Sequence, residues 1–337
     1  MNIRELMESR EEMLLSPFAA KSTQSRGRDR DEEQCDIRTV YQRDRDRIVH
    51  CKAFRRLKHK TQVFLAPEGD HFRERMTHTL EVAQISRTIA RSLSLNEDLT
   101  EAIALGHDLG HTPFGHAGER TLNTILDRYG YHFKHNEQSV RVVEILEKDG
   151  VGLNLTWEVR DGILNHGTKD MPHTLEGQVV RISDKIAYVN HDMDDAFRAG
   201  VLSEKDVPDN IRKILGHSTH DRLDTLIKQV INGSMDKETV TLPEEYMDAL
   251  YQLRSFMFDK LYTNPAVKAE EKKAGIMLKL LFDYYMTYPE LLPKEYIEIR
   301  MRDNLPWEII TADYISGMTD YYATKKFQDV YIPAGWK

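Results

Sequence analysis

A chain of 337 residues can bury a sizeable core, as one large domain or as one domain with an appendage. Its net charge of −8 argues against a general nucleic-acid-binding protein, and no apolar run approaches the roughly 18 residues of a membrane-spanning helix. The charged start of the chain lacks the apolar stretch of a signal peptide. The two cysteines, Cys35 and Cys51, form no CxxC pair, so we expect a cytoplasmic protein without disulfides or membrane contact.

Basic residues are concentrated near the start of the chain. Residues 21–60 carry thirteen Lys and Arg against seven Asp and Glu, a local net charge of +6, so the remainder is near −14. Such a run is either a solvated surface with many ion pairs or an anion site, because guanidinium groups bind phosphate in a forked geometry. A local basic strip can also contact a nucleic-acid strand.

Apolar residues recur at helical spacing along most of the chain, and alternating runs are rare, so we predict an all-α fold. Residues 21–36 are polar and are expected to form a loop. A helical stripe follows at Ile48, Cys51, Phe54, Leu57 and Thr61. Residues 66–72 contain a proline and a glycine and are predicted to form a turn.

Two further helices are predicted in the first half of the chain and one in the middle. The first spans 74–93 and has one apolar face formed by Val82, Ile85, Ile89 and Leu93. Asn96 is expected to cap the next, which carries Leu99, Ile103 and His107 at steps of four. A third helix is predicted over 176–197, and residues 232–245 are expected to link it to a second helical section.

Two histidines fall on core-facing stripes of these helices. His78 lies four residues before Val82, and His107 lies four after Ile103, so both are expected to point inward. Asp108 follows, about 100° further round the helix. One buried histidine is usually a hydrogen-bonded core residue. Two of them beside a buried carboxylate favour a divalent cation, because an unpaired buried carboxylate is costly.

Asp184 is the best candidate for a fourth ligand. Steps of four place on one helix face Val180, Asp184, Tyr188 and Asp192. The opposite stripe consists of Ile182, Ile186 and Val189. A solvated surface is the alternative interpretation. Two histidines with two aspartates form a mixed nitrogen and oxygen set, which suits one Mn, Fe, Co, Ni or Zn ion and suits Mg less well.

The pattern His78…His107-Asp108…Asp184 resembles the HD superfamily of metal-dependent phosphohydrolases. A bare His-Asp pair occurs by chance, but the surrounding segments are more specific and resemble the deoxyguanosinetriphosphate triphosphohydrolase branch. These segments are residues 38–64, 75–90, 107–119 (HDLGHTPFGHAGE), 182–196 and 313–323. The resemblance runs from about residue 24 to 325. Thr112 stands where many members have proline, and Cys51 where serine is frequent.

The resemblance implies an all-α helical bundle and a particular reaction. Water attacks the α-phosphorus of a deoxynucleoside triphosphate, dGTP or another, and the products are deoxynucleoside and tripolyphosphate. His116 and Glu119 match the family's catalytic pair, with His116 favoured as the acid for the leaving 5′-oxygen and a base role left open. Glu119 can fix the tautomer of His116 and raise its pKa.

Other positions carry roles by the same resemblance. His111 and His135 match histidines that face the phosphates, and Arg75 matches an arginine that clamps the triphosphate. Lys185 would add positive charge beside Asp184. Tyr188 and Asp192 match residues that pack on the deoxyribose and bind its 3′-hydroxyl, a task that Gln62 would share. The remaining histidines are expected to be structural or solvent-exposed: His50, His59, His71, His132, His166, His173, His191, His217 and His220.

The expected domains are a polar N-terminal segment over 1–35, the phosphohydrolase core over 36–232 and a C-terminal helical section over 233–337. Arg55 and Arg56 are expected to meet phosphates, a second nucleotide or acidic neighbours. By resemblance we expect a homo-oligomer, and a nucleotide effector or single-stranded DNA as a further partner.

Two other functions stay open from the sequence. One is a different HD enzyme, such as a nucleotidase, a cyclic-nucleotide phosphodiesterase or a guanosine tetraphosphate hydrolase. The other is a non-catalytic sensor of nucleotide or single-stranded DNA, which would have no need of His116 and Glu119.

Overall fold

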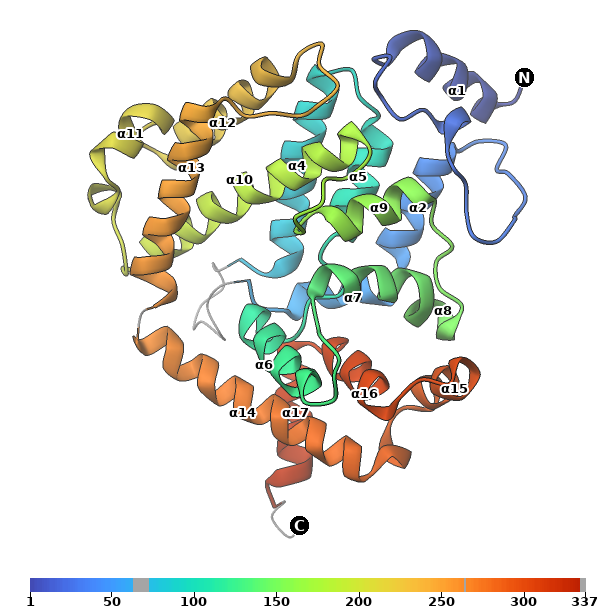
Figure 1. Ribbon diagram of the computed structural model, residues 1–337, viewed down its shortest axis with the longest axis vertical. Helices are drawn as coiled ribbons and strands as arrows, with labels where there is room; N and C mark the ends of the chain where they lie inside the picture. Colours follow the sequence, from blue (N-terminus) through green and yellow to red (C-terminus); the bar gives the residue numbers. More distant parts are fainter. Residues whose placement is uncertain (63–72, 264, 334–337) are drawn as a thin grey trace. The chain divides into compact units, whose positions relative to one another are not determined.

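The apolar stripes of the sequence form helices in the computed structural model, which describes residues 1–62, 73–263 and 265–333 (Figure 1). Every regular element of these residues is helical, apart from one isolated bridge between Thr61 and Glu74, so the all-α prediction is confirmed. Among the described helices we find none with the length and apolar character that a membrane crossing requires. The turn expected at 66–72, with His71, lies outside the described residues.

The chain divides into two compact units whose segments alternate in sequence. Unit 1 consists of Met1–Ile48, Thr77–His107 and Asn154–Pro265, and unit 2 of Val49–Met76, Asp108–Leu153 and Ala266–Lys337. The chain passes from unit 1 to unit 2 at the peptide bond between His107 and Asp108. The expected domain boundaries at residues 35 and 232 describe a different partition and stay a prediction.

Three mutually packed helices form the centre of unit 1. The longest, α10 (Leu175–Arg198), contacts both α5 (Glu97–Gly106) and α9 (Trp157–Asn165), which also contact each other. Their shared core is fully buried at Ile103, Ile163 and Ile186. Helix α10 carries Asp184 and α5 leads into His107. The other helices that lie wholly or mostly in unit 1 are α1 (Ile3–Leu14), α2 (Val40–His50), α4 (Arg75–Ser92), α11 (Asp209–Leu215), α12 (Thr219–Ser234) and α13 (Glu244–Met257), with short turns at Ser22–Gln24, Glu204–Asp206 and Phe258–Tyr262.

Unit 2 has its own apolar core. Helix α6 (Gly115–Asp127) contacts α16 (Trp307–Ser316). Leu122 of α6 and Ile315 of α16 are fully buried members of one cluster, together with Phe282 from α14 (Pro265–Thr287). The remaining helices are α3 (Lys52–Arg56), α7 (His135–Arg141), α8 (Glu147–Gly150), α15 (Lys294–Asp303) and α17 (Asp320–Tyr331), with short turns at Leu57–His59, Val142–Leu146 and Pro289–Leu291.

The predicted helices over 74–93 and 176–197 correspond to α4 and α10. Asn96 caps α5 as expected, because its side chain accepts a hydrogen bond from Leu99 N. The stripe from Ile48 to Thr61 does not form one helix. Cys51 Sγ accepts from Phe54 N and starts α3.

Glu147 explains this second helix start. Its carboxylate accepts hydrogen bonds from Lys52 N at 3.0 Å and Ala53 N at 2.7 Å. These are main-chain donors that have no partner within a helix, and a negative charge at a helix start is favourable.

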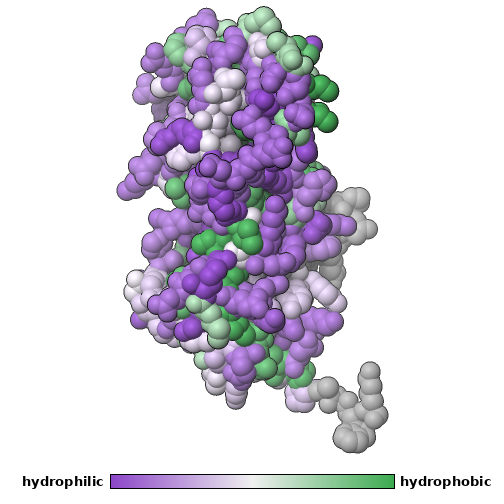
Figure 2. All heavy atoms as spheres, turned by 90° about the vertical axis from the view of Figure 1, so that its right-hand side faces the viewer, coloured by the Kyte–Doolittle hydropathy of each residue, from purple (hydrophilic) through white to green (hydrophobic). Residues whose placement is uncertain are grey.

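The basic run over 21–60 is largely paired with carboxylates. Within unit 1, Arg47 lies 2.7 Å from Glu32 and Arg45 lies 2.8 Å from Asp98. In unit 2, Arg56 lies 3.9 Å from Glu147. These contacts favour an ion-paired surface over an anion site. The face shown in Figure 2 is mostly hydrophilic, with hydrophobic side chains in smaller groups.

Candidate active site

Unit 1 brings together three of the predicted metal ligands. His78 on α4 and His107 at the end of α5 are 2% and 0% exposed, as their helical phase predicts. His78 Nε2 lies 3.1 Å and His107 Nε2 lies 3.8 Å from the same oxygen, Oδ1 of Asp184. The two rings are 5.7 Å apart and inclined at 62°. Three potential ligand atoms therefore lie close together, although their residues are up to 106 positions apart in the chain.

The hydrogen bonds of this group fit a metal site. His107 Nδ1 lies 2.6 Å from Ala104 O, so Nδ1 carries the proton and donates it there, and Nε2 on the side of Asp184 is the acceptor nitrogen. Metal-binding histidines commonly donate their other N–H to a carbonyl in this way. Burial opposes ionisation of Asp184, but the hydrogen bond from His78 and the neighbouring imidazoles outweigh it and hold the pKa of Asp184 below its usual value.

Two further histidines border this group and were missed by sequence reasoning. The ring of His166 lies 5.0 Å from that of His107, and the ring of His191 lies 6.0 Å from that of His78. Both are buried, so their assignment to structural or exposed positions understates their place beside the site. His166 follows Ile163 by three residues on the inward face of α9. This is the same phase signal that identified His107.

The residues expected to contact the sugar lie on α10 in unit 1. Tyr188 is half-buried and Asp192 is fully buried, one and two turns beyond Asp184. The ammonium of Lys185 lies 5.9 Å from the centre of the Tyr251 ring. The positive charge of Lys185, which was expected beside Asp184, therefore also lies within cation–π distance of the Tyr251 ring.

Unit 2 holds a second polar group, which begins at Asp108. Arg75, at the start of α4, is 3% exposed and donates to Asp108 Oδ2 and, at 3.2 Å, to Thr61 O. Gly110 allows the loop after Asp108 to lie against the start of α7. A Cβ at this position would lie 2.2 Å from Ser139 N and 2.7 Å from His135 O, so any other residue would separate the two segments.

Glu119 is the centre of this second group. Its Oε2 lies 3.2 Å from His116 Nδ1, and its Oε1 accepts from both Nδ1 and the main-chain N of His135, each at 2.9 Å. Burial opposes ionisation of Glu119, but the bonds from His116 and His135 hold its pKa well below the usual range. For His135, burial lowers the pKa, but the hydrogen bond to Glu119 outweighs burial and raises the pKa above its usual value.

His111 completes the group. Its ring stacks on that of His135 at 4.5 Å and lies 5.3 Å from that of His116. One ligand atom each from Asp108, His111 and His135 lie within 4.8 Å of one another. Burial, Arg75 and His135 lower the pKa of His111 well below its usual value, so the two stacked rings have pKa values shifted in opposite directions. Its buried Nδ1 has no hydrogen-bond partner in the described part of the chain.

Gln62 is also in unit 2 and is buried. Gly115, with φ of +54°, lies beside it, because a Cβ on Gly115 would lie 3.5 Å from Gln62 O. The predicted residues thus fall into two sets. Unit 1 contains His78, His107, Asp184, Lys185, Tyr188 and Asp192, and unit 2 contains Gln62, Arg75, Asp108, His111, His116, Glu119 and His135.

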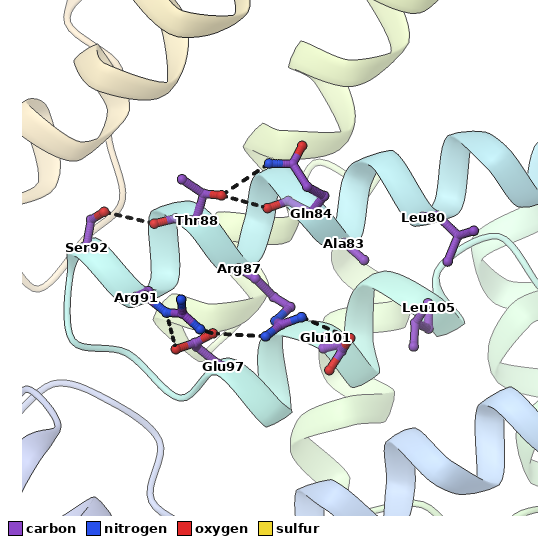
Figure 3. Close-up of a pocket in the computed structure, with 10 residues that line it drawn as sticks. All are labelled: Leu80, Ala83, Gln84, Arg87, Thr88, Arg91, Ser92, Glu97, Glu101 and Leu105. Carbon is purple, nitrogen blue, oxygen red and sulfur yellow. Dashed lines mark hydrogen bonds and ion pairs between the residues drawn. The ribbon is translucent and has the colours of Figure 1, made fainter.

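A pocket of about 410 Å³ in unit 1 contains none of these residues (Figure 3). It is lined by α4 and α5, and its polar side chains are paired with one another. Arg91 lies 2.8 Å and Arg87 lies 3.4 Å from Glu97. This pocket therefore offers no unpaired charge to a phosphate and is separate from the residues expected to do chemistry.

Known proteins resemble the chain over its whole length. A deoxyguanosinetriphosphate triphosphohydrolase-like protein from Caldanaerobacter subterraneus subsp. tengcongensis is 58% identical over 336 residues, which cover 100% of this chain and 98% of that one. The chain belongs to the deoxyguanosinetriphosphate triphosphohydrolase-like family. A family member from Clostridium perfringens is 50% identical over 99% of this chain and 98% of its own. Another from Geobacter sulfurreducens is 40% identical over 97% of both.

Two domain families also match this triphosphohydrolase-like chain. The HD domain matches residues 75–189, and the phosphohydrolase-associated domain matches residues 240–329. The resemblance stated from sequence is confirmed, and the protein is a hydrolase of the HD phosphohydrolase class. The HD match includes all four predicted metal ligands and begins at Arg75, whereas Gln62 and Asp192 lie outside it.

Proposed function

We propose that the protein hydrolyses deoxynucleoside triphosphates, dGTP among them, to deoxynucleoside and tripolyphosphate with the help of one divalent cation. The observation that carries the proposal is that two groups of polar residues with different chemical character meet in the sequence at His107 and Asp108. His107 belongs to a group with metal-ligand character, and the residues from Asp108 onward lead to an array of His116, Glu119 and His135 with proton-transfer character. The names of the relatives supply the substrate class.

The residues proposed to hold the cation are His78, His107, Asp108 and Asp184. Asp108 is included because it is joined to His107 by a peptide bond and because the family pattern contains it. The donor set favours Mn, Fe, Co, Ni or Zn over Mg. When bound, such a cation polarises a phosphoryl oxygen and lowers the pKa of water.

His116 is proposed as the acid that protonates the leaving 5′-oxygen. Its ring is half-exposed and therefore accessible to a substrate, while Nδ1 is held by Glu119. The pKa of Glu119 is held low by His116 and His135, and its carboxylate fixes the tautomer and orientation of the His116 ring that it contacts. His135 and His111 are proposed to bind the phosphate oxygens, with Arg75 and Lys185 adding positive charge.

The sugar would be selected by Tyr188, with Asp192 and Gln62 at its 3′-hydroxyl. We expect Tyr188→Ala to weaken discrimination against ribonucleoside triphosphates, because removing the ring opens space beside C2′. The measurement is the ratio of kcat/KM for a deoxy- and a ribonucleotide with the same base. Tyr246→Ala, at a half-buried tyrosine of α13, is the matched control. An unchanged ratio in Tyr188→Ala would remove the tyrosine from the role of filter.

A product assay tests the function as a whole. The protein is supplied with Mn²⁺ and a panel of deoxy- and ribonucleoside triphosphates, and both the nucleoside and the phosphate product are identified. We expect deoxynucleoside and tripolyphosphate in equal amounts. Orthophosphate as the first product would instead indicate another HD phosphohydrolase, and turnover of no nucleotide with any of the proposed metals would favour a sensor. Assembly into an oligomer, a nucleotide effector, contact with single-stranded DNA and a cytoplasmic location stay predictions.

A further inference from the structure

Lys60 is a buried lysine in unit 2 to which the proposed chemistry gives no task. The residue is 2% exposed, and its Nζ donates to the main-chain carbonyls of His111 and, at 2.8 Å, of Ser316. Ser316 is the last residue of α16, where carbonyl groups have no partner within the helix. Burial lowers the pKa of Lys60 well below its usual value, and a buried amino group is costly unless its hydrogens are bonded, so both contacts constrain its position. Lys60 therefore ties the main chain at His111 to the end of α16.

Asp320 makes a parallel connection from the next helix. It is the first residue of α17, but the cap of that helix is Thr319, which accepts from Tyr322 N. The carboxylate of Asp320 is therefore directed elsewhere. Its Oδ1 accepts from Phe114 N at 2.9 Å, and its Oδ2 accepts from Thr61 N at 3.0 Å and from the Thr61 hydroxyl.

The backbone at Phe114 explains why such a bond is needed. Phe114 has φ of 61° and ψ of 27°, a left-handed conformation that side chains disfavour, and Gly115 follows with φ of +54°. This pair of residues turns the chain into α6, whose second residue is His116. Without an external constraint, a segment that relies on a disfavoured conformation would sample others. Asp320 supplies the constraint at the main-chain N of Phe114.

We propose that Lys60 and Asp320 are positioning residues that hold residues 111–116, so that His111 and His116 keep their places beside His135 and Glu119. Asp320 lies in the part of the chain that matches the phosphohydrolase-associated domain, and the segment it holds lies in the HD domain. The C-terminal section thus takes part in the chemistry through the main chain of the loop. We call these contacts of Lys60 and Asp320 with the loop the brace. The catalytic role of the brace rests on the proposed function, whereas its geometry does not.

Asp320→Asn is the variant that tests the brace with least disturbance. An asparagine has one acceptor oxygen and one NH₂ group, so it cannot accept from Phe114 and from Thr61 with two oxygens, and one N–H would face another. Thr61→Val removes only the hydroxyl bond and should have a smaller effect of the same kind. Asp329→Asn removes the same charge from an exposed position on α17 and is the control.

The first measurement is hydrogen exchange, followed by mass spectrometry, in peptides covering 111–118. We expect Asp320→Asn to speed exchange there by about tenfold, since a hydrogen bond to a charged group is lost, with a smaller increase in Thr61→Val and none in Asp329→Asn. Peptides from α10 should be unaffected. This measurement does not depend on any activity. Unchanged exchange in 111–118 would overturn the brace even if the protein releases tripolyphosphate.

The second measurement is kinetic and separates positioning from general loss of structure. Asp320→Asn should lower kcat by about tenfold while KM, bound metal and the melting temperature stay close to the parent values. In a His116→Ala background the same change should cost little more, because Asp320 acts through His116. A multiplicative loss in the double variant, or faster exchange with unchanged kcat, would refute the positioning role. If the unaltered protein releases no tripolyphosphate, the proposed function fails and the exchange result alone decides the brace.

Discussion

Asp184→Ala should abolish stoichiometric metal binding and reduce turnover by roughly 10³-fold or more, because a bound cation stabilises the transition state by several kcal/mol. In unit 1, Asp184 Oδ1 lies 3.1 Å from His78 Nε2 and 3.8 Å from His107 Nε2. Of the proposed ligands, this variant keeps only His78, His107 and Asp108, which would hold a divalent cation more weakly than the full set. We therefore expect excess metal to restore little activity.

The test compares metal content after gel filtration, single-turnover rate and far-ultraviolet circular dichroism. Asp224→Ala serves as the control, since that side chain lies on α12 and pairs with Lys228 at 2.7 Å on the surface. The Asp184 variant should remain folded, because its carboxylate is not part of the apolar core of α10. One equivalent of metal retained with near-normal turnover would show that Asp184 is not a ligand.

Helical phase was sufficient to predict the helices that carry His78, His107 and Asp184, the candidate metal ligands of unit 1. Val82, Ile85 and Ile89 are all buried on α4, and the same phase correctly placed His78 inside. On α5, the phase of the buried Ile103 likewise correctly predicted that His107 is buried. Periodicity works here because each of these helices packs one apolar face into the core of its unit. It failed between Ile48 and Thr61, where Glu147 caps a new helix from far along the chain, and such a long-range contact leaves no periodic signal.

The second polar group shows a different limit of sequence reasoning. His116 and Glu119 are three residues apart at the start of one helix, and their contact follows from helical geometry. The contact between Glu119 and His135 spans sixteen residues and depends on how closely α7 approaches Gly110, which spacing does not reveal. Lys60 is harder still. A lysine in a basic run is expected at the surface, and only the two carbonyl groups that it meets explain its burial.

His116→Ala should keep its metal and bind substrate, yet lose kcat by about 10²–10⁴, the usual contribution of a general acid. A deoxynucleoside 5′-alkoxide is a poor leaving group, so protonation of that oxygen is part of the barrier. Glu119→Gln should lose less on its own. The double variant should be little worse than His116→Ala, because the carboxylate acts through the ring that it contacts at 3.2 Å.

The structure adds a pH dependence to this prediction, because Glu119 also holds His135. Burial lowers the pKa of His135, but the bond from His135 to Glu119 raises it above the usual value. Glu119→Gln removes the negative charge, so the pKa of His135 should fall and the ring should lose its proton at a lower pH. Because the proposed acid His116 also titrates, the comparison is made in the His116→Ala background. If the protonated ring of His135 draws in phosphate, adding Glu119→Gln there should move the alkaline limb of the kcat/KM profile to lower pH. The checks are metal content, single-turnover rate and pH profile for all three variants. Loss of metal from His116→Ala would make His116 a ligand, and losses that multiply in the double variant would uncouple Glu119 from it.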